Sequence, residues 1–382
     1  MIHSSNGVIL FIVNFYPPHV GGLERYIEGL ARALAKTSNH EIHIITHRDR
    51  PHLPSLEVTP EGIRVHRIDA LFCIADVLCI PHPIQLWKVL SNFSTHQLSG
   101  ISIHTRFFPI SLLGALFGKW KSAKVIFTEH GSDYVRFPSS KLIELFSKIY
   151  DLTLGRWTIA LATIRSGASQ SAARFVEHLG GQHVQILENA VDLDFWSEKS
   201  SKSRKDSNNT HTVSDHFIYI GRIASGKGWD IAVRAHQSQE PEFRKKYPLI
   251  LIGDGTEVDR LIDMIQQDPC IQFLGPQGPD IIRTHLDRAI TLNPTQLSES
   301  LQTILIEAAA TQSWILSSPT PEAVQFLQQG FGRIVTSDWA QAMRESIHER
   351  PIPESLSKLG YYSWKNRAEI FLQWIVEPNQ KR

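Results

Sequence analysis

The chain has 382 residues, of which 42% are hydrophobic and 20% charged, so it has enough apolar material for two or three folded domains and is not a disordered chain. Its 39 Lys and Arg residues against 38 Asp and Glu residues give a net charge of +1, so no bulk charge points to nucleic acid or to an anionic surface, although a local basic patch remains compatible with it. Three cysteines, Cys73, Cys79 and Cys270, are too few for a disulfide framework and lack the spacing of zinc ligands, which is typical of a reducing, cytoplasmic compartment.

Hydropathy predicts neither a signal peptide nor a transmembrane helix. The apolar run at 8–13 is too short for the hydrophobic region of a signal peptide and is followed by Asn14. An apolar stretch near 149–164 is interrupted by Asp151 and Arg156, and nothing approaches the roughly 18 unbroken apolar residues of a transmembrane helix. We therefore expect a cytoplasmic protein.

The first half of the chain alternates short β-branched runs with helical segments. Between the first two runs, apolar residues from Leu23 to Leu34 recur at helical spacing and form one stripe. This alternation predicts βαβ units and a parallel sheet. The expected strands lie at 8–13, 42–46, 63–68, 101–104, 124–128, 159–164 and 184–187.

The second half repeats this pattern after a polar interruption. Residues 197–215 are rich in Ser, Lys, Asn and Asp and predict a linker or a long surface loop. Residues 356–376 close the chain as a helical segment. Further strands are expected at 217–220, 249–252, 271–274, 290–292, 314–316 and 333–336.

The sequence thus predicts an α/β protein with two parallel-sheet lobes. The expected divisions are a first domain over 1–196, a linker over 197–215, a second domain over 216–355 and a C-terminal helical segment over 356–382. Two such lobes imply a cleft, and ligands of open α/β sheets bind beyond the carboxyl ends of the strands. The loops that follow strands are therefore the informative ones.

Two glycine-containing loops follow the first strand of each lobe. The loop at 15–24 (FYPPHVGGLE) places two glycines before a helix, whose free N–H groups suit an anion, although a tight strand-to-helix turn would also need glycine. The loop at 221–228 (GRIASGKG) nearly matches a phosphate-binding loop, but Gly228 replaces the hydroxyl residue that binds magnesium. Arg222 and Lys227 remain as two cations suited to a diphosphate without a metal, or are ordinary surface cations of a turn.

Two carboxylates, Glu299 and Glu307, border a helix whose apolar residues would pack on the second sheet. Eight helical steps separate them by about 12 Å along the axis, which is too far to share one proton or one metal. They could contact two ends of one long ligand such as a nucleotide sugar, or be an acid near a helix start and a surface acid.

In order and spacing, these segments resemble family 4 of the retaining glycosyltransferases, which have the GT-B fold of two Rossmann-like lobes facing across a cleft, with a C-terminal helix that crosses back to the first lobe. The Glu-x7-Glu spacing of Glu299 and Glu307 is the most specific part of the likeness. The other matching segments are 15–24, 127–133 (FTEHGSD), 189–192 with Phe195, 221–230, 249–255, 271–275 and Ser363–Trp364. One departure follows Glu307, where AAATQSW and SSPTPE replace the glycines that the family has near the sugar.

The resemblance implies a role for each matching residue. Arg222 and Lys227 would neutralise the diphosphate of a nucleotide-diphosphate sugar, and the backbones of Gly21 and Gly22 would meet the phosphate from the first domain. His130, within the His-Gly segment, would approach the sugar and support an oxocarbenium-like transition state. The predicted catalytic residues are His130, Glu299, Arg222 and Lys227, and the predicted donor-binding residues are Gly21, Gly22, Arg222, Lys227, Glu299 (sugar) and Glu307 (ribose).

The resemblance predicts a retaining hexosyltransferase that moves a sugar from GDP-mannose or a UDP-hexose to a glycan or a lipid-linked acceptor, in the biosynthesis of cell-surface glycans or glycolipids. No metal, no tightly bound cofactor and no nucleic acid are expected. A basic segment with a tryptophan at 118–124 (GKWKSAK) suggests peripheral contact with the inner face of a membrane, or is an exposed basic helix end. Two alternatives stay open: a non-catalytic nucleotide-sugar-binding protein and, because of 221–228, a phosphate-loop nucleotide hydrolase.

Overall fold

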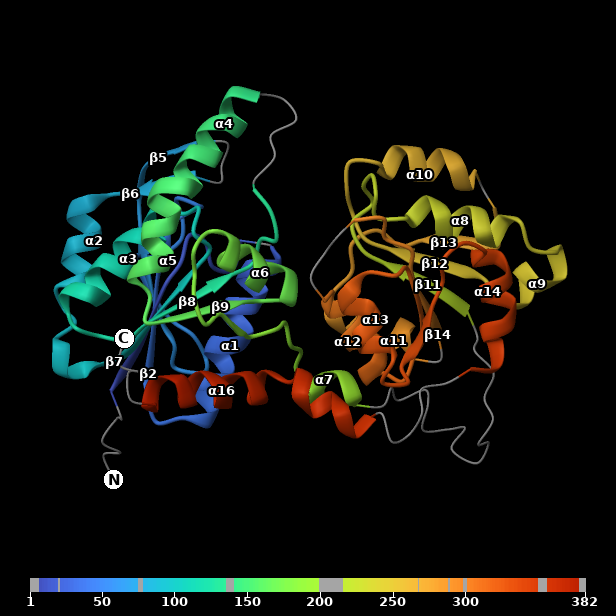
Figure 1. Ribbon diagram of the computed structural model, residues 1–382. Helices are drawn as coiled ribbons and strands as arrows, with labels where there is room; N and C mark the ends of the chain where they lie inside the picture. Colours follow the sequence, from blue (N-terminus) through green and yellow to red (C-terminus); the bar gives the residue numbers. More distant parts are fainter. Residues whose placement is uncertain are drawn as a thin grey trace. The chain divides into compact units, whose positions relative to one another are not determined.

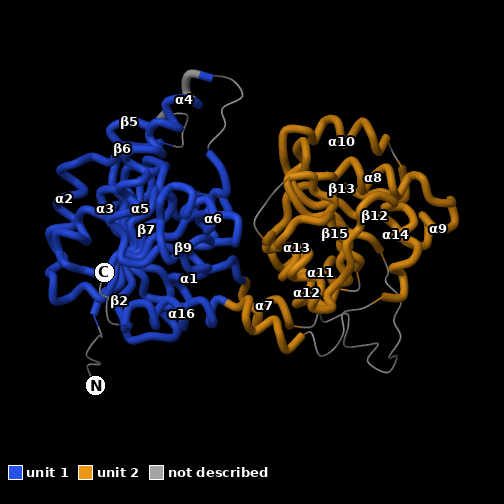
Figure 2. The backbone as a smooth tube through the Cα atoms, in the orientation of Figure 1, with its two compact units in different colours: residues 1–190, 364–382 blue, residues 191–363 orange. Residues whose placement is uncertain are grey.

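The computed structural model divides into two compact units, which are described separately below. Unit 1 comprises residues 1–190 and 364–382, and unit 2 comprises residues 191–363 (Figure 2). The structure describes residues 7–19, 21–74, 78–134, 141–198, 216–266, 268–287, 289–297, 301–349 and 356–377.

Unit 1 is built on an eight-stranded sheet within the described residues, in the order β10-β9-β8-β7-β1-β2-β4-β3. All neighbouring strands pair in parallel except β3 and β4. The central strand β1 is buried along its whole length, which is what a run of five apolar residues predicts for a parallel sheet covered on both faces. The strands are β1 (Val8–Ile12), β2 (Glu41–His47), β3 (Leu56–Val58), β4 (Arg64–Ile68), β7 (Leu98–His104), β8 (Val125–Glu129), β9 (Ile164–Gly167) and β10 (Gln185–Ile186).

Helices cover both faces of this sheet (Figure 1). On one face, α1 (Gly22–Thr37) packs beside the C-terminal helix α16 (Trp364–Val376), so the end of the chain returns to the first unit, as the resemblance implies. The remaining helices of unit 1 are α2 (Pro83–Leu90), η1 (Thr95–Gln97), α3 (Pro109–Trp120), α4 (Lys141–Tyr150), the π-helical turn η2 (Asp151–Gly155), α5 (Arg156–Leu161) and α6 (Gln170–His178).

The strand expected at 159–164 is wrong in its first part. Residues 156–161 form α5, which continues from η2, and the strand β9 begins only at Ile164. A short apolar run reads equally well as a buried helix segment, so the β-branched residues alone did not decide between the two.

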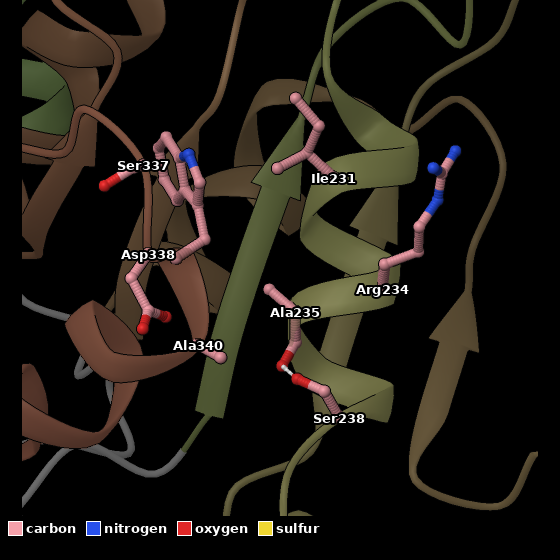
Figure 3. Close-up of a pocket in the computed structure, with 8 residues that line it drawn as sticks. Ile231, Arg234, Ala235, Ser238, Ser337, Asp338 and Ala340 are labelled. Atoms are coloured by element: carbon pink, nitrogen blue, oxygen red, sulfur yellow. Dashed lines mark hydrogen bonds between the residues drawn. The ribbon is translucent and has the colours of Figure 1, made fainter.

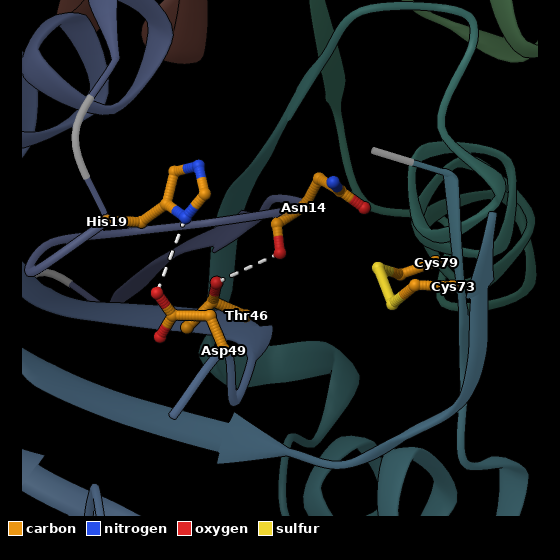
Figure 4. The surroundings of a disulfide bond; sticks show 6 residues. All are labelled: Asn14, His19, Thr46, Asp49, Cys73 and Cys79. Atoms are coloured by element: carbon orange, nitrogen blue, oxygen red, sulfur yellow. Dashed lines mark hydrogen bonds and ion pairs between the residues drawn. A yellow bond between two sulfur atoms is a disulfide. The ribbon is translucent and has the colours of Figure 1, made fainter. Parts of the chain in front are cut away.

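A small hairpin of β5 (Ala70–Ile74) and β6 (Leu78–Pro81) was not predicted, and it corrects the interpretation of the cysteines. Antiparallel pairing sets Cys73 opposite Cys79, with 4.1 Å between their Cα atoms, and the two form a disulfide (Figure 4). The cysteines therefore do not indicate a reducing compartment.

Unit 2 is built on a six-stranded sheet within the described residues, parallel throughout, in the order β13-β12-β11-β14-β15-β16. The strands are β11 (His216–Ile220), β12 (Leu249–Ile252), β13 (Ile271–Phe273), β14 (Ala289–Asn293), β15 (Trp314–Ser317) and β16 (Gly332–Ile334). The helices are α7 (Leu193–Ser197), α8 (Trp229–Gln237), α9 (Pro241–Lys246), α10 (Val258–Ile265), α11 (Pro279–Leu286), α12 (Thr303–Ala310), α13 (Pro321–Leu327), α14 (Trp339–Glu345), η4 (Ser346–His348) and η5 (Ser357–Tyr362).

The strand order reverses between β11 and β14 in unit 2, and between β1 and β7 in unit 1. Such a reversal separates the loops on either side of it and is where open α/β sheets bind ligands.

The unit boundaries differ from the expected domain boundaries. Residues 191–198 and 356–363 belong to unit 2, whereas the sequence assigned nearly all of the former to the first domain and the latter to the C-terminal segment. Most of the expected linker, at 199–215, lies outside the described residues. Among the described residues, no helix combines the length and the apolar character that a membrane crossing requires.

Candidate active site

In unit 2, the loop at 221–228 follows β11 directly at the switch point. Hydrogen bonds hold it on both sides: the amide of Ile223 donates to the carbonyl of Asp254 (2.8 Å), and the amide of Gln296 donates to the carbonyl of Gly226 (2.8 Å). The loops after β12 and β14 thus hold the predicted diphosphate-binding loop in a defined backbone conformation.

Gly228 lies at the N-terminus of α8 and explains why this loop is not a magnesium-binding phosphate loop. Its φ is +80°, a left-handed conformation that side chains rarely adopt, and a Cβ there would overlap the carbonyl oxygen of Pro294. No hydroxyl residue fits at this position, which argues against the hydrolase interpretation.

The two predicted cations lie on this loop. Arg222 is exposed and Lys227 is partly buried. The loop opens α8, whose first turn has backbone N–H groups without partners inside the helix. Two cations beside a helix N-terminus would suit a diphosphate.

One of the two predicted carboxylates lies within the described residues and the other does not. Glu307 lies in the middle of α12 and is partly exposed, between buried residues that pack on the core of unit 2. Glu299 lies outside the described residues.

In unit 1, Gly21 and Gly22 open α1 at the end of the loop after β1. Gly22 is exposed, and a Cβ there would meet nothing within 4 Å, so the space above it is open. A Cβ at Gly21 would overlap the carboxylate of Glu24, which folds back over the helix N-terminus. Burial raises the pKa of Glu24, although its bond to a backbone N–H partly offsets this. Glu24 is thus a neighbour of the predicted phosphate contact that the sequence analysis did not single out.

Glu129, at the end of β8, sets the His-Gly turn. Its carboxylate accepts hydrogen bonds from the backbone N–H groups of His130 (3.0 Å) and Gly131 (2.9 Å). Arg106 Nη1 lies 3.1 Å from Glu129 Oε2, and Arg106 Nη2 lies 2.9 Å from Asp151 Oδ2. All three charged side chains are buried.

Burial and ion pairing act against each other in this triad of Arg106, Glu129 and Asp151. Burial alone would lower the pKa of Arg106, but the carboxylates of Glu129 and Asp151 more than offset it and raise that pKa. Burial raises the pKa of Asp151, and Arg106 only partly counters it. A single buried guanidinium therefore holds two carboxylates, and through Glu129 it fixes the backbone at His130.

The imidazole of His130 lies among other rings. Its Nε2 is 3.1 Å from His104 Nδ1, and the ring of Tyr26 meets it edge-on at 4.7 Å between centroids. Burial lowers the pKa of His130 to about 4, and burial together with the neighbouring His130 lowers the pKa of His104 well below its usual range. Both histidines are therefore neutral at pH 7.

A groove elsewhere in unit 2 is not part of this site. It lies between α8 and the start of α14 and is lined by residues such as Ile231, Arg234 and Asp338 (Figure 3). Arg234 pairs with Asp230, and Asp338 caps α14 through the amide of Gln341, so these polar groups serve the local structure. None of the predicted site residues line it. Among the described residues, no cluster of three or more His, Cys, Asp or Glu side chains could hold a metal.

Comparison with solved structures shows a fold of the GT-B type. The crystal structure of Anabaena HepE in complex with UDP superimposes with a TM-score of 0.69 at 16% identity, over 96% of this chain and 99% of that one. The agreement with two parallel sheets and a returning C-terminal helix confirms the expected fold class.

The chain belongs to glycosyltransferase family 4. The model described as Glycosyltransferase Family 4 matches residues 20–195, and the model described as Glycosyl transferases group 1 matches residues 214–349. An uncharacterized glycosyltransferase of Methanocaldococcus jannaschii is 23% identical over 353 residues, 86% of this chain and 85% of that protein. The GPI3 subunit of phosphatidylinositol N-acetylglucosaminyltransferase from Saccharomyces cerevisiae is 21% identical over 386 residues, 94% of this chain and 81% of that protein. The protein is accordingly an enzyme, a glycosyltransferase that uses a nucleotide sugar.

Proposed function

We propose that this enzyme is a retaining hexosyltransferase that transfers a sugar from a nucleoside-diphosphate donor to a glycan or lipid-linked acceptor. The proposal rests on Arg222 and Lys227. Both lie on a loop that hydrogen bonds hold in place at the switch point of unit 2. A diphosphate that leaves the sugar gains negative charge, and two fixed cations stabilise it without a metal.

The proposed reaction breaks the bond between the anomeric carbon and the diphosphate oxygen. The acceptor hydroxyl forms the new bond on the same face of the sugar, and its proton passes to the departing diphosphate. Arg222 and Lys227 stabilise that leaving group, Glu307 binds the ribose hydroxyls, and Glu299 binds the transferred sugar. The backbone at Gly21 and Gly22 contacts the phosphate, and His130 lies near the sugar.

We propose a UDP-hexose or GDP-mannose as the donor. HepE has been solved with UDP and with UDP-glucose, which favours uridine. To test this, calorimetry would measure binding of UDP, GDP and ADP, each with and without magnesium. Binding of one nucleotide, unchanged by magnesium, would support the proposal. If none of the three binds, the non-catalytic alternative moves ahead; magnesium-dependent hydrolysis of ATP or GTP would instead favour a hydrolase.

For the acceptor, we propose a lipid-linked molecule met at the inner face of a membrane, as part of cell-surface glycan or glycolipid synthesis. The name of the yeast relative includes phosphatidylinositol, which is a membrane lipid. Unit 1 also carries a surface suited to a bilayer, here called the α2–α5 surface. In it, α3 packs against α5, and Trp87 of α2 stacks on Trp120 of α3 at 5.6 Å between ring centroids.

The α2–α5 surface combines exposed apolar side chains with cations. Lys121 Nζ lies 4.4 Å above the ring of Trp120. Among the described residues of α2, α3, α4, η2 and α5, Glu144 is the exposed acidic residue, because Asp151 is buried against Arg106. Aromatic and aliphatic groups would enter the acyl boundary while the cations meet anionic headgroups. The exposed apolar residues are Ile84, Trp87, Leu113, Leu116, Trp120, Leu145, Phe146, Ile149, Leu152, Leu154 and Trp157, and the cations are Lys88, Lys119, Lys121, Lys141, Lys148 and Arg156.

Flotation with vesicles tests this surface. We expect the protein to float with anionic vesicles at low salt, and the double change Trp87→Ser and Trp157→Ser to reduce that binding at least about tenfold. Ile262→Ser is the matched control, since Ile262 is an exposed apolar residue of unit 2. No binding by the unchanged protein at low salt, or an equal loss in the control, would exclude membrane contact through this surface.

A further inference from the structure

A chain of three polar side chains runs from the interior of unit 1 to His130. Ser102 Oγ lies 3.0 Å from His104 Nε2, and His104 Nδ1 lies 3.1 Å from His130 Nε2. Ser102 and His104 share one face of β7 and are fully buried, while His130 follows the neighbouring strand β8 and is partly exposed. The chain therefore has a closed inner end and an open outer end.

Only certain proton positions satisfy this chain. Each neutral imidazole carries one N–H, and the serine hydroxyl carries one O–H. Burial keeps both histidines neutral at pH 7. A buried donor without an acceptor is costly, so the proton that has the fewest acceptors decides the arrangement.

That proton is the hydroxyl proton of Ser102. Within the described residues, His104 Nε2 is the hydrogen-bond partner of Ser102 Oγ. If Ser102 donates to Nε2, then His104 carries its proton on Nδ1 and donates it to His130 Nε2. In the opposite direction, His104 Nε2–H would donate to Ser102, and the hydroxyl proton would point into the packed core without an acceptor.

We propose that Ser102 and His104 are positioning residues that hold His130 in the tautomer with its proton on Nδ1, so that His130 meets the ligand as a hydrogen-bond donor. Its role toward the ligand depends on the proposed function; its tautomer does not. This assignment rests on the network of hydrogen bonds, which is the usual way to infer a histidine tautomer.

The geometry around His130 supports an outward-facing donor. Glu129 fixes the backbone of the turn, Tyr26 packs on the ring, and Nε2 is used by His104, so Nδ1 is the ring nitrogen left for a ligand. An N–H at that place suits an oxygen with lone pairs, such as a sugar hydroxyl or a phosphoryl oxygen of the donor. It does not suit a general base, because a base would need the lone pair there.

Nitrogen NMR of the protein with 15N-labelled histidine tests the tautomer directly. A free neutral imidazole prefers the proton on Nε2, so the expected Nδ1–H pattern would be unusual. The His130 signals are identified by their loss in His130→Asn. A pattern with the proton on Nε2 would overturn the proposal, whether or not the protein transfers sugar.

Ser102→Ala then tests the origin of the preference. We expect the Nδ1–H population of His130 to fall and kcat to drop about tenfold, with the donor KM nearly unchanged, since one hydrogen-bond donor would be misaligned. Ser102→Thr keeps the hydroxyl and should restore both the Nδ1–H population of His130 and kcat.

Ser166→Ala is the matched control: Ser166 is a buried serine of β9 whose hydroxyl bonds Thr128 and the carbonyl of Phe127. An unchanged tautomer in Ser102→Ala, or an equal loss in the control, would refute the role of Ser102. Absence of turnover with every donor would count against the proposed function and leave the NMR result standing.

Discussion

Arg222 and Lys227 are the residues on which the proposed chemistry depends most. Each should stabilise the charge that develops on the departing diphosphate, so Arg222→Ala or Lys227→Ala is expected to cost roughly 2–4 kcal/mol in the activation free energy. Steady-state kinetics with the nucleotide sugar identified by calorimetry would measure this loss. Arg234→Ala is a suitable control, because Arg234 is a cation of α8 that pairs with Asp230. Rates close to the unchanged enzyme in both variants would contradict the assigned role.

His47 makes unit 1 sensitive to acid. It is buried on β2, both its ring nitrogens lack a hydrogen-bond partner within the described residues, and burial lowers its pKa to about 4. The unfolded chain takes up a proton near pH 6.5 while the folded chain does not, so stability is present above pH 6.5 and is lost as the pH falls toward 4. We expect this residue to account for about 2–3 kcal/mol of the loss between pH 7 and pH 4.5.

Urea unfolding at the two pH values tests this expectation. His47→Leu should show a smaller acid-induced loss of the free energy of unfolding than the unchanged protein does. His52→Leu replaces an exposed histidine of the same unit and should not change the pH dependence. An identical pH dependence in all three proteins would show that His47 titrates normally.

At the scale of single residues, sequence reasoning identified groups that lie in local motifs. Arg222, Lys227 and Gly228 fall within eight residues, so a pattern along the chain was enough to single them out. The partners of His130 and Glu129 escaped, because His104 lies 26 residues from His130 and Arg106 lies 23 residues from Glu129, and they meet only through strand register and packing. Glu24 was interpreted as the end of a glycine loop. The sequence pattern does not predict that its carboxylate folds back over Gly21.

At the scale of elements, the contact between α1 and α16 depends on one glycine. A Cβ at Gly29 would overlap the indole of Trp364, so the two helices can approach only because this side chain is missing. Glycine inside a helix costs roughly 0.5–1 kcal/mol relative to alanine, which makes close packing the reason for its presence. Gly29→Leu is therefore expected to destabilise unit 1 by about 1–3 kcal/mol through overpacking.

Chemical denaturation followed by tryptophan fluorescence would report this change, since Trp364 lies at the contact. Lys36→Leu provides the comparison, as it places the same side chain at an exposed position of α1. If Gly29→Leu proved no less stable than Lys36→Leu, the close approach of the two helices would be refuted.

The alternation of strands and helices could be predicted because each apolar run is a local signal. The hairpin of β5 and β6 could not, because its strands do not belong to the large sheet and their partner is each other. The helix α5 could not be predicted either, because the apolar run at 159–164 has the pattern of a strand. In both cases tertiary context decided what the local pattern left open.

At the scale of the whole molecule, both sheets reverse their strand order beside their first strand, so each unit offers one switch point. The two units differ in the predicted site residues that they contain. The predicted cations and Glu307 belong to unit 2, whereas the predicted contacts in unit 1 are the backbone of Gly21 and Gly22 and the side chain of His130. A nucleoside diphosphate should therefore stabilise unit 2 more than unit 1. At a ligand concentration of about 100 times Kd, the gain is roughly 2.7 kcal/mol for the unit that binds.

Scanning calorimetry with UDP, or with whichever nucleotide binds, can test this difference. Because the units have separate cores, we expect two unfolding transitions. Gly29→Leu should lower the midpoint temperature of one of them, which identifies it as the transition of unit 1. The nucleotide should raise mainly the midpoint temperature of the other transition, and this rise should disappear in Lys227→Ala, because the diphosphate loses one of its two cations. A nucleotide that raises only the transition lowered by Gly29→Leu would mean that the donor binds to unit 1, and the roles of Arg222 and Lys227 would have to be abandoned.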